Sequence, residues 1–149
     1  MSANVDVGLF SCPSCKGFNR IPTSKISAGP KCGRCKTALD TSGGPVVLDD
    51  ASFQSFVKHS PVPVLLDIWA PWCGPCRAVA PVVEAIGKEN AGKMVLAKLN
   101  SDDNPNTARA LAVRSIPTLM VYSGGEVVER VAGSRPKPQI EALFKPYMS

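Results

Sequence analysis

The 149-residue sequence contains no long hydrophobic run. Its longest apolar stretches, residues 62–70 and 119–122, are far shorter than the ~18 apolar residues that a transmembrane helix requires. The first ten residues also lack the basic and apolar segments of a secretory signal. We therefore expect a chain that neither spans nor binds a membrane, that is not exported by the secretory route, and that resides in the cytoplasm.

Aromatic residues are scarce, at 6% of the chain, and the N-terminal part contains only Phe10 and Phe18. This part nevertheless carries most of the net charge of +5: residues 1–45 have six Lys/Arg against two Asp, and residues 46–149 have eleven against ten acidic residues. Clustered basic residues can neutralise phosphates, but single-stranded nucleic acids also need aromatic side chains for base stacking. A solvated basic surface is favoured over a nucleic-acid partner.

The sequence has one histidine, His59. A Cys–His nucleophile pair needs a third group that orients the histidine, and no such group is apparent. His59 is instead predicted to cap the end of a helix.

Six cysteines are present, and each belongs to a Cys-x-x-Cys pair. This spacing is typical of metal ligands or redox dithiols, not of a secreted disulfide framework. The first two pairs are separated by 16 residues, which fits a zinc site built from two such pairs. The four residues are Cys12, Cys15, Cys32 and Cys35.

Two facing Cys-x-x-Cys turns would supply four sulfurs at tetrahedral corners, which closes the site to substrate. A segment of about 40 residues usually cannot build a sufficient core without a metal or disulfides. We therefore expect one structural Zn²⁺ per chain. The alternatives are two labile disulfides, four unliganded thiols, or iron held by the same four sulfurs.

The domain organisation follows from composition. Residues 1–40 are predicted to form the zinc-binding module, residues 41–45 a short polar, glycine-rich linker that acts as a hinge, and residues 46–149 a second domain. In the second domain, the pattern predicts helices at residues 52–59, 77–90, 105–112 and 136–147, and strands at 62–70, 94–99, 117–123 and 126–132. The order from residue 46, β-α-β-α-β-α-β-β-α, predicts an α/β fold with a mixed sheet and helices on its faces.

The third cysteine pair, Cys73 and Cys76, comes after the buried strand and opens a helix. At a helix N-terminus, unpaired N–H groups and the helix dipole favour the thiolate of Cys73. Cys76 lies one turn further in and stays closer to a protonated thiol. Cys73 is therefore predicted to be the more readily ionised sulfur of the pair.

A carboxyl group in the middle of the apolar strand, at Asp67, is expensive to bury, so its pKa should be raised. Asp67 precedes Cys73 by six residues and could lie beneath Cys76, where it would take the Cys76 proton directly or through a water. The alternative is a structural carboxylate paired with Lys98 of the neighbouring strand.

These residues match the pattern of a known family. The motifs are Asp67-Ile-Trp-Ala-Pro-Trp-Cys-Gly-Pro-Cys76, Pro81, Lys98-Leu-Asn100, Arg114-Ser-Ile-Pro-Thr118 and Gly133. Over residues 46–149 the chain resembles the thioredoxin family, and with its four-cysteine module it is similar to the bacterial thioredoxin 2 type. The resemblance implies a thioredoxin fold preceded by a small zinc-ribbon-like module.

The resemblance also implies a function, that of a protein disulfide reductase. Cys73, as the exposed sulfur that the helix dipole stabilises, would attack an oxidised client protein, and Cys76 would resolve the mixed disulfide. A flavin-dependent thioredoxin reductase would restore the dithiol. Asp67 would act as the base for Cys76, tuned by Lys98. The Gly74-Pro75 dipeptide supplies no cation beside the thiolate, which favours a reductant over an oxidase or isomerase.

The resemblance implies a client-binding surface around the dithiol. It would comprise Trp72, Gly74, Pro75, Ile116, Pro117 and Gly133. Pro117 would be a cis-proline that leaves the backbone of Ile116 free to pair with an extended client segment. The chain departs from the commonest family pattern at Pro71, Ser101 and Ser115, which concerns client preference and not the reaction.

A different class of function is a zinc-module adaptor or redox sensor that uses the thioredoxin fold as a docking scaffold. A scaffold requires neither a nucleophile nor a base. The presence of Cys73, Cys76 and Asp67 therefore argues against it.

Overall fold

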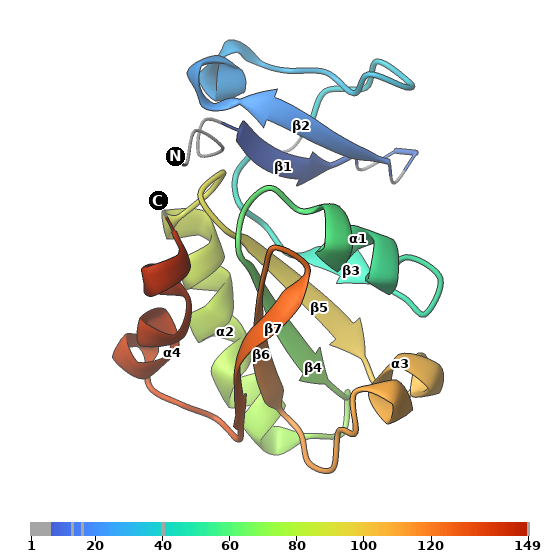
Figure 1. Ribbon diagram of the computed structural model, residues 1–149, viewed down its shortest axis with the longest axis vertical. Coiled ribbons are helices and arrows are strands. Elements are labelled where there is room, and N and C mark those ends of the chain that lie inside the picture. The colour runs from blue at the N-terminus through green and yellow to red at the C-terminus, as the bar shows by residue number, and fades with distance from the viewer. Residues whose placement is uncertain (1–6, 13, 16, 40, 149) are drawn as a thin grey trace.

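A computed structural model describes residues 7–12, 14, 15, 17–39 and 41–148 of the chain. It shows a small N-terminal hairpin module at one end of a larger α/β domain (Figure 1). The larger domain has the mixed sheet flanked by helices that the sequence predicts.

The N-terminal module is built on the antiparallel pair β1 (Val7–Ser11) and β2 (Phe18–Pro22). A short 3₁₀ helix, η2 (Thr23–Ala28), comes next and ends at Gly29, whose φ of 71° is readily adopted by glycine. Of the side chains in the described part of this module, only Phe10, Cys12 and Cys32 are buried apolar ones. Such a small apolar core agrees with the expectation that metal ligation stabilises the module.

The central sheet has five strands in the order β3-β5-β4-β6-β7. Their bounds are β3 Val46–Leu48, β4 Val64–Trp69, β5 Val95–Asn100, β6 Thr118–Ser123 and β7 Glu126–Ala132. Strands β3, β5 and β4 run parallel, and β6 and β7 are antiparallel additions. Strand β4 is covered on both faces, which explains its nearly continuous apolar sequence.

Helices pack on both faces of the sheet. Their bounds are α1 Phe53–His59, α2 Gly74–Glu89, α3 Pro105–Ala110 and α4 Lys137–Phe144, after which comes the 3₁₀ turn η3 Lys145–Tyr147. Helix α1 contributes Phe53 and Phe56 to the core on one face, while α2 and α4 fill the core on the other. The predicted helix over 136–147 is divided in the structure, because Pro146 has no N–H for a helical bond.

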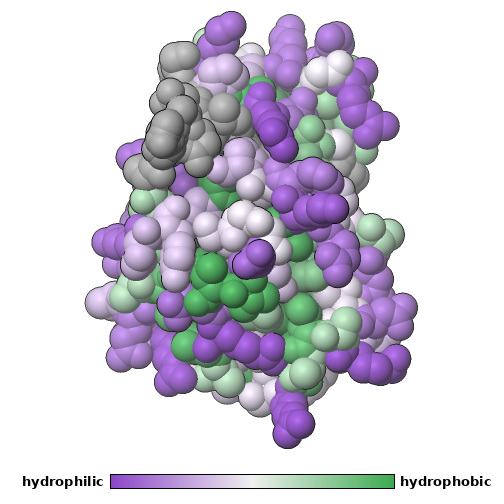
Figure 2. Space-filling view, viewed as in Figure 1, coloured by the Kyte–Doolittle hydropathy of each residue, from purple (hydrophilic) through white to green (hydrophobic). Residues whose placement is uncertain are grey.

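The visible surface of the molecule is largely hydrophilic, but some hydrophobic side chains of the larger domain are exposed on it. Figure 2, in the orientation of Figure 1, shows hydrophilic side chains around the outline of the molecule and hydrophobic ones gathered over the middle of the larger domain. Strand β7, which lies at the front of the sheet in this view, includes Val127, a residue that is 46% exposed. Isolated exposure of this kind is ordinary at an edge strand.

The N-terminal module contacts the larger domain at the end of the sheet opposite the start of α2 (Figure 1). The rings of Phe18 and Phe56 meet edge to face with their centroids 4.6 Å apart. Arg20 donates a hydrogen bond of 2.7 Å from Nη2 to the backbone carbonyl of His59. His59 is the last residue of α1 and its Nδ1 lies 2.9 Å from the Ser55 carbonyl, which confirms its predicted place at a helix end.

The predicted linker packs against the larger domain. Gly43 has a φ of 86°, and a Cβ added there would collide with the backbone carbonyl of Gly87 in α2. This close approach requires glycine, and it holds the glycine-rich segment in place at Gly43. The boundaries at residues 40 and 46 stay a prediction.

Candidate active site and metal centre

The dithiol lies where β4 ends and α2 begins. Cys73 and Cys76 form a disulfide, and Cys73 is the N-cap of α2, with its Sγ accepting the Cys76 N–H at 3.2 Å. Both residues are only 3% exposed, so the expectation that Cys73 is the exposed sulfur is wrong for the oxidised protein. The N-cap position, not exposure, is what distinguishes the two sulfurs.

A second loop brings the predicted client surface to the dithiol. The Ile116–Pro117 peptide bond is cis, as the resemblance implies. The Ile116 carbonyl lies 3.7 Å from the Cys73 Sγ, and the Gly133 N–H donates to the Pro117 carbonyl at 2.7 Å. Three segments far apart in the sequence therefore meet beside the two sulfurs.

Trp72 is the largest apolar side chain on this surface, and it is 67% exposed. Its Nε1 donates a hydrogen bond of 3.0 Å to Oδ2 of Asp102, in the loop after β5. Gly74 and Pro75 are also exposed in the first turn of α2. Together these residues give the dithiol an accessible rim, although the sulfurs themselves are covered.

Asp67 lies in the middle of β4 and is fully buried. Among the described residues neither of its carboxylate oxygens has a hydrogen-bond partner. Burial raises the pKa of Asp67 to about 6, the positive charge of Lys98 lowers it, and the negative charge of Glu84 raises it. A carboxyl group with this pKa can exchange a proton near neutral pH.

Lys98 is the cross-strand neighbour of Asp67, but its ammonium is directed elsewhere. Lys98 Nζ lies 3.3 Å from Oε2 of Glu84 in α2 and 5.3 Å from the ring centroid of Trp69. The alternative in which Asp67 is a structural partner of Lys98 is therefore not the arrangement in this structure.

A cavity of about 300 Å³ opens beside the dithiol. It is lined by Trp69, Ala70, Pro71, Cys76, Arg77, Ala80 and Lys98. Because Cys76 is part of its wall, the cavity offers a route by which water and protons reach the second sulfur.

The four N-terminal cysteines lie together in a second cluster. Their sulfurs all lie within 4.8 Å of one another, with Cys12 Sγ and Cys35 Sγ 3.5 Å apart and Cys15 Sγ and Cys32 Sγ 3.6 Å apart. Sulfurs bound tetrahedrally at about 2.3 Å from a zinc ion lie about 3.8 Å from each other. The cluster therefore fits a single tetrahedral metal ion.

Hydrogen bonds favour the ionised form of two of these sulfurs, Cys32 and Cys35. The Cys35 and Arg34 N–H groups lower the pKa of Cys32 to about 6. The hydroxyl and N–H of Thr37 lower the pKa of Cys35. The Gly17 N–H lowers the pKa of Cys15, but burial and hydrogen bonds with the other three cysteine sulfurs raise it to about 11. Thiolates are the ligand form that a metal ion requires.

Two residues near the dithiol were missed by the sequence interpretation, Glu84 and Asp102. Glu84 could have been found because it lies eight residues after Cys76, which places both on one face of α2. Asp102 could have been found because β4 and β5 are parallel, so the loops after them lie at the same edge of the sheet.

The fold, the disulfide at a helix N-terminus and the adjacent cis-proline define a thiol–disulfide oxidoreductase. The family model described as "Thioredoxin" matches residues 44–146, and the model described as "Thioredoxin 2, N-terminal" matches residues 11–37. The chain belongs to the thioredoxin family, with the N-terminal zinc-ribbon module of thioredoxin 2.

Curated relatives and a solved structure agree with this assignment. The chain is 50% identical over 101 residues to a thioredoxin of Synechocystis sp., covering 68% of this chain and 94% of that protein. It is 44% identical over 144 residues to a chloroplastic M-type thioredoxin of Zea mays, covering 95% and 84%. A mutant thioredoxin from Halobacterium salinarum NRC-1 superposes with a TM-score of 0.67 at 30% identity, covering 74% of this chain and 96% of that structure.

Within the part of the chain that the structure describes, no helix is both long enough and apolar enough to cross a membrane.

Proposed function

We propose that this chain is a protein disulfide reductase that transfers two electrons from its dithiol to oxidised client proteins. The observation that carries this proposal is the Cys73–Cys76 disulfide at the N-terminus of α2, next to cis-Pro117. The strand that leads to it, β4, contains a buried carboxylate, Asp67, that has no hydrogen-bond partner among the described residues. A scaffold protein would gain nothing from such a buried carboxyl group, which destabilises the fold.

The reaction begins with the Cys73 thiolate, which attacks one sulfur of a client disulfide and displaces the other as a thiolate. Asp67 then accepts the Cys76 proton, directly or through a water. The Cys76 sulfur attacks Cys73 Sγ, the mixed disulfide breaks, and the client leaves with both sulfurs reduced. The Cys73–Cys76 disulfide forms as the oxidised product.

The rim of the dithiol would hold the client during these steps. Exposed Trp72, Gly74 and Pro75 would contact it on one side, and the loops of Ile116, Pro117 and Gly133 on the other. An extended client segment could pair with the backbone of Ile116. We propose that a flavin-dependent thioredoxin reductase then returns the protein to the dithiol state in the cytoplasm.

For the four-cysteine cluster we propose one structural Zn²⁺, held by Cys12, Cys15, Cys32 and Cys35. The bound ion would supply ligation energy to a module with little apolar core. All four sulfurs would be ligands, so no open position would be left for substrate. We propose residues 1–40 as this module, 41–45 as the linker and 46–149 as the catalytic domain.

The proposed function is tested by reduction of insulin with dithiothreitol as electron donor, which precipitates the insulin B chain when the disulfides are cleaved. We expect the wild-type protein to accelerate precipitation well above the rate with dithiothreitol alone. An unaccelerated rate with a fully reduced dithiol would contradict the proposal. Metal analysis of the same preparation should give about one zinc per chain.

A further inference from the structure

Glu84 lies on the face of α2 that carries Cys76. Cys76, Ala80 and Glu84 are spaced four residues apart, and Cys76 and Ala80 both line the cavity beside the dithiol. The carboxylate of Glu84 reaches across to Lys98 in β5, which lines the same cavity. Glu84 is therefore linked to the wall of the cavity that gives access to Cys76.

Two acidic residues, Asp67 and Glu84, are candidate partners of the Lys98 ammonium. The position of Lys98 in β5 is directly opposite Asp67 in β4, and Glu84 lies on the helix above. The ammonium pairs with Glu84 at 3.3 Å and lies 5.3 Å from the Trp69 ring, while both Asp67 oxygens lack a hydrogen-bond partner among the described residues. The Lys98 side chain is 14% exposed, so it has little freedom to turn to solvent.

We propose that Glu84 is a positioning residue for the resolving step, because it holds the Lys98 ammonium away from Asp67 and leaves the buried carboxylate free to accept the Cys76 proton. This inference rests on the proposed function of the dithiol. Neither the motif around the cysteines nor the predicted client surface includes Glu84.

The charges around Asp67 support the proposal. Strand β5 contributes Lys98, helix α2 contributes Glu84, and strand β6 places uncharged Leu119 opposite Asp67. Arg77, on the cavity rim, is bound to the Pro71 carbonyl at 2.7 Å. The negative charge of Glu84 raises the pKa of Asp67, so its removal lowers that pKa directly and also frees Lys98 to approach.

The test replaces Glu84 by glutamine in the full-length oxidised protein and follows the carboxyl carbon of Asp67 by NMR as the pH is changed. We expect the pKa of Asp67 to fall by roughly 0.5 to 1 unit in Glu84→Gln. An unchanged or raised pKa would overturn the proposal. The measurement does not depend on activity.

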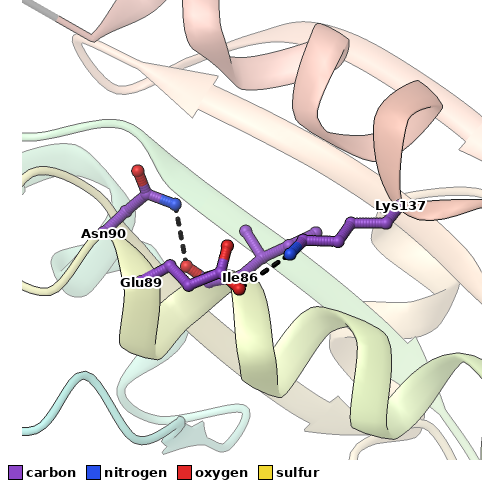
Figure 3. Close-up of polar contacts among 4 residues, drawn as sticks. All are labelled: Ile86, Glu89, Asn90 and Lys137. Atoms are coloured by element: carbon purple, nitrogen blue, oxygen red, sulfur yellow. Dashed lines mark hydrogen bonds and ion pairs between the residues drawn. The ribbon is translucent and has the colours of Figure 1, made fainter.

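The matched control is Glu89→Gln, which removes a second ion pair that α2 forms among the described residues. Figure 3 shows Glu89 reaching Lys137, at 2.7 Å, beside Ile86 and Asn90 at the far end of the helix. This variant also deletes one negative charge and one ion pair from α2, but away from the cavity. We expect it to leave the Asp67 titration unchanged, and an equal shift in both variants would overturn a specific effect of Glu84.

A double-variant experiment separates positioning from direct repulsion. If Glu84 acts by holding Lys98, the change in the pKa of Asp67 caused by Glu84→Gln should be clearly smaller in a Lys98→Met background. An equal shift in both backgrounds would show that Glu84 acts through its charge alone, which would overturn the positioning role.

The final readout is the rate of mixed-disulfide resolution against pH in single-turnover experiments. In Glu84→Gln the acidic limb of this profile should move to lower pH by the same amount as the Asp67 titration, and Glu84→Asp should restore part of the wild-type position. A profile that does not move while the NMR titration does would overturn the link to the resolving step. Failure of the wild-type protein to reduce insulin would instead remove the proposed function itself.

Discussion

The three Cys-x-x-Cys turns of this chain have the same spacing, but their sulfurs have different partners. In each turn the first sulfur accepts a backbone N–H from within the turn. These bonds are Ser14 N–H to Cys12 at 3.3 Å, Arg34 N–H to Cys32 at 3.4 Å, and Cys76 N–H to Cys73 at 3.2 Å. A backbone N–H donated to the first sulfur is therefore common to the four-cysteine cluster and the dithiol.

The difference lies in the path of the chain beyond each turn. In the N-terminal module the chain turns back, with Cys12 N–H bonded to the Gly17 carbonyl and Cys32 N–H to the Thr37 carbonyl, both at 2.8 Å. The sulfurs of each pair then face those of the other pair. After Cys73 the chain continues into a helix of 16 residues, and its two sulfurs meet each other. The path of the backbone beyond the turn, and not the cysteine spacing, therefore decides whether the sulfurs of a pair face another pair or each other.

The largest expected effect separates the two sulfurs of the dithiol. Cys73→Ser should reduce insulin no faster than dithiothreitol alone, because the attacking thiolate is gone. Cys76→Ser should instead accumulate clients as mixed disulfides, because the resolving sulfur is gone. Non-reducing gels after incubation with oxidised clients measure the trapped species. Equal trapping by the two variants would contradict the assignment of attacking and resolving sulfurs.

The next largest effect is expected at the four-cysteine cluster. Cys32→Ser should lose about one equivalent of metal and unfold the N-terminal module, since ligation supplies an apparent ~10–16 kcal/mol in small zinc modules. Insulin reduction should persist, because the dithiol lies at the opposite end of the sheet (Figure 1). Metal analysis and the insulin assay, run on one sample, check both halves. Loss of reduction together with the metal would break the distinction between the two kinds of turn.

Much of the larger domain could be predicted because its signals are local. The order of strands and helices is readable from alternating apolar segments, and the strand with Asp67 is apolar on both faces. The cis bond before Pro117 could not be derived from spacing, since an Ile–Pro bond is trans by default, and only the family resemblance implies it.

The contacts that needed three-dimensional packing could not be predicted. The sequence shows Lys98 and Asp67 as candidates for an ion pair, but the structure pairs Lys98 with Glu84, which competes from a helix that the strand pattern does not place. The glycine-rich segment looks like a free hinge in the sequence because its contact with Gly87 involves backbone alone. The pairing of Phe18 with Phe56 likewise leaves no trace in either local sequence.

A smaller effect is expected from the burial of Asp67. Asp67→Asn should slow the resolving step up to about 100-fold near neutral pH, because the proton acceptor is lost. The variant should also be more stable above pH 6 by about 2–3 kcal/mol, since one pKa unit corresponds to about 1.4 kcal/mol. The folded pKa of about 6 lies above the ordinary 3.8, so the wild-type protein loses stability as the pH rises from about 4 to 6.

Urea unfolding of the oxidised protein at pH 4 and pH 8 measures this dependence. Asp67→Asn should show little of the wild-type loss between the two values. Unchanged turnover together with lower stability at pH 8 would contradict both the base and the desolvation argument. Asp102→Asn is a suitable control, because Asp102 is exposed and lies in the loop beside Trp72.

The smallest expected effect concerns the contact between the two regions. Phe18→Ala removes the edge-to-face pair with Phe56, a type of contact that is worth about 0.5–1.5 kcal/mol beyond the area it buries. In the wild-type protein, metal removal should therefore lower the unfolding midpoint of the larger domain slightly, because the unfolded module no longer covers Phe56. In Phe18→Ala this metal-dependent shift of the unfolding midpoint should be smaller.

Val47→Ala is the control for the loss of an apolar surface group, because Val47 is 80% exposed on β3. Calorimetry with and without a chelator measures the shift of the unfolding midpoint. An equal shift in wild type and Phe18→Ala would show that this aromatic pair does not connect the four-cysteine cluster to the stability of the larger domain.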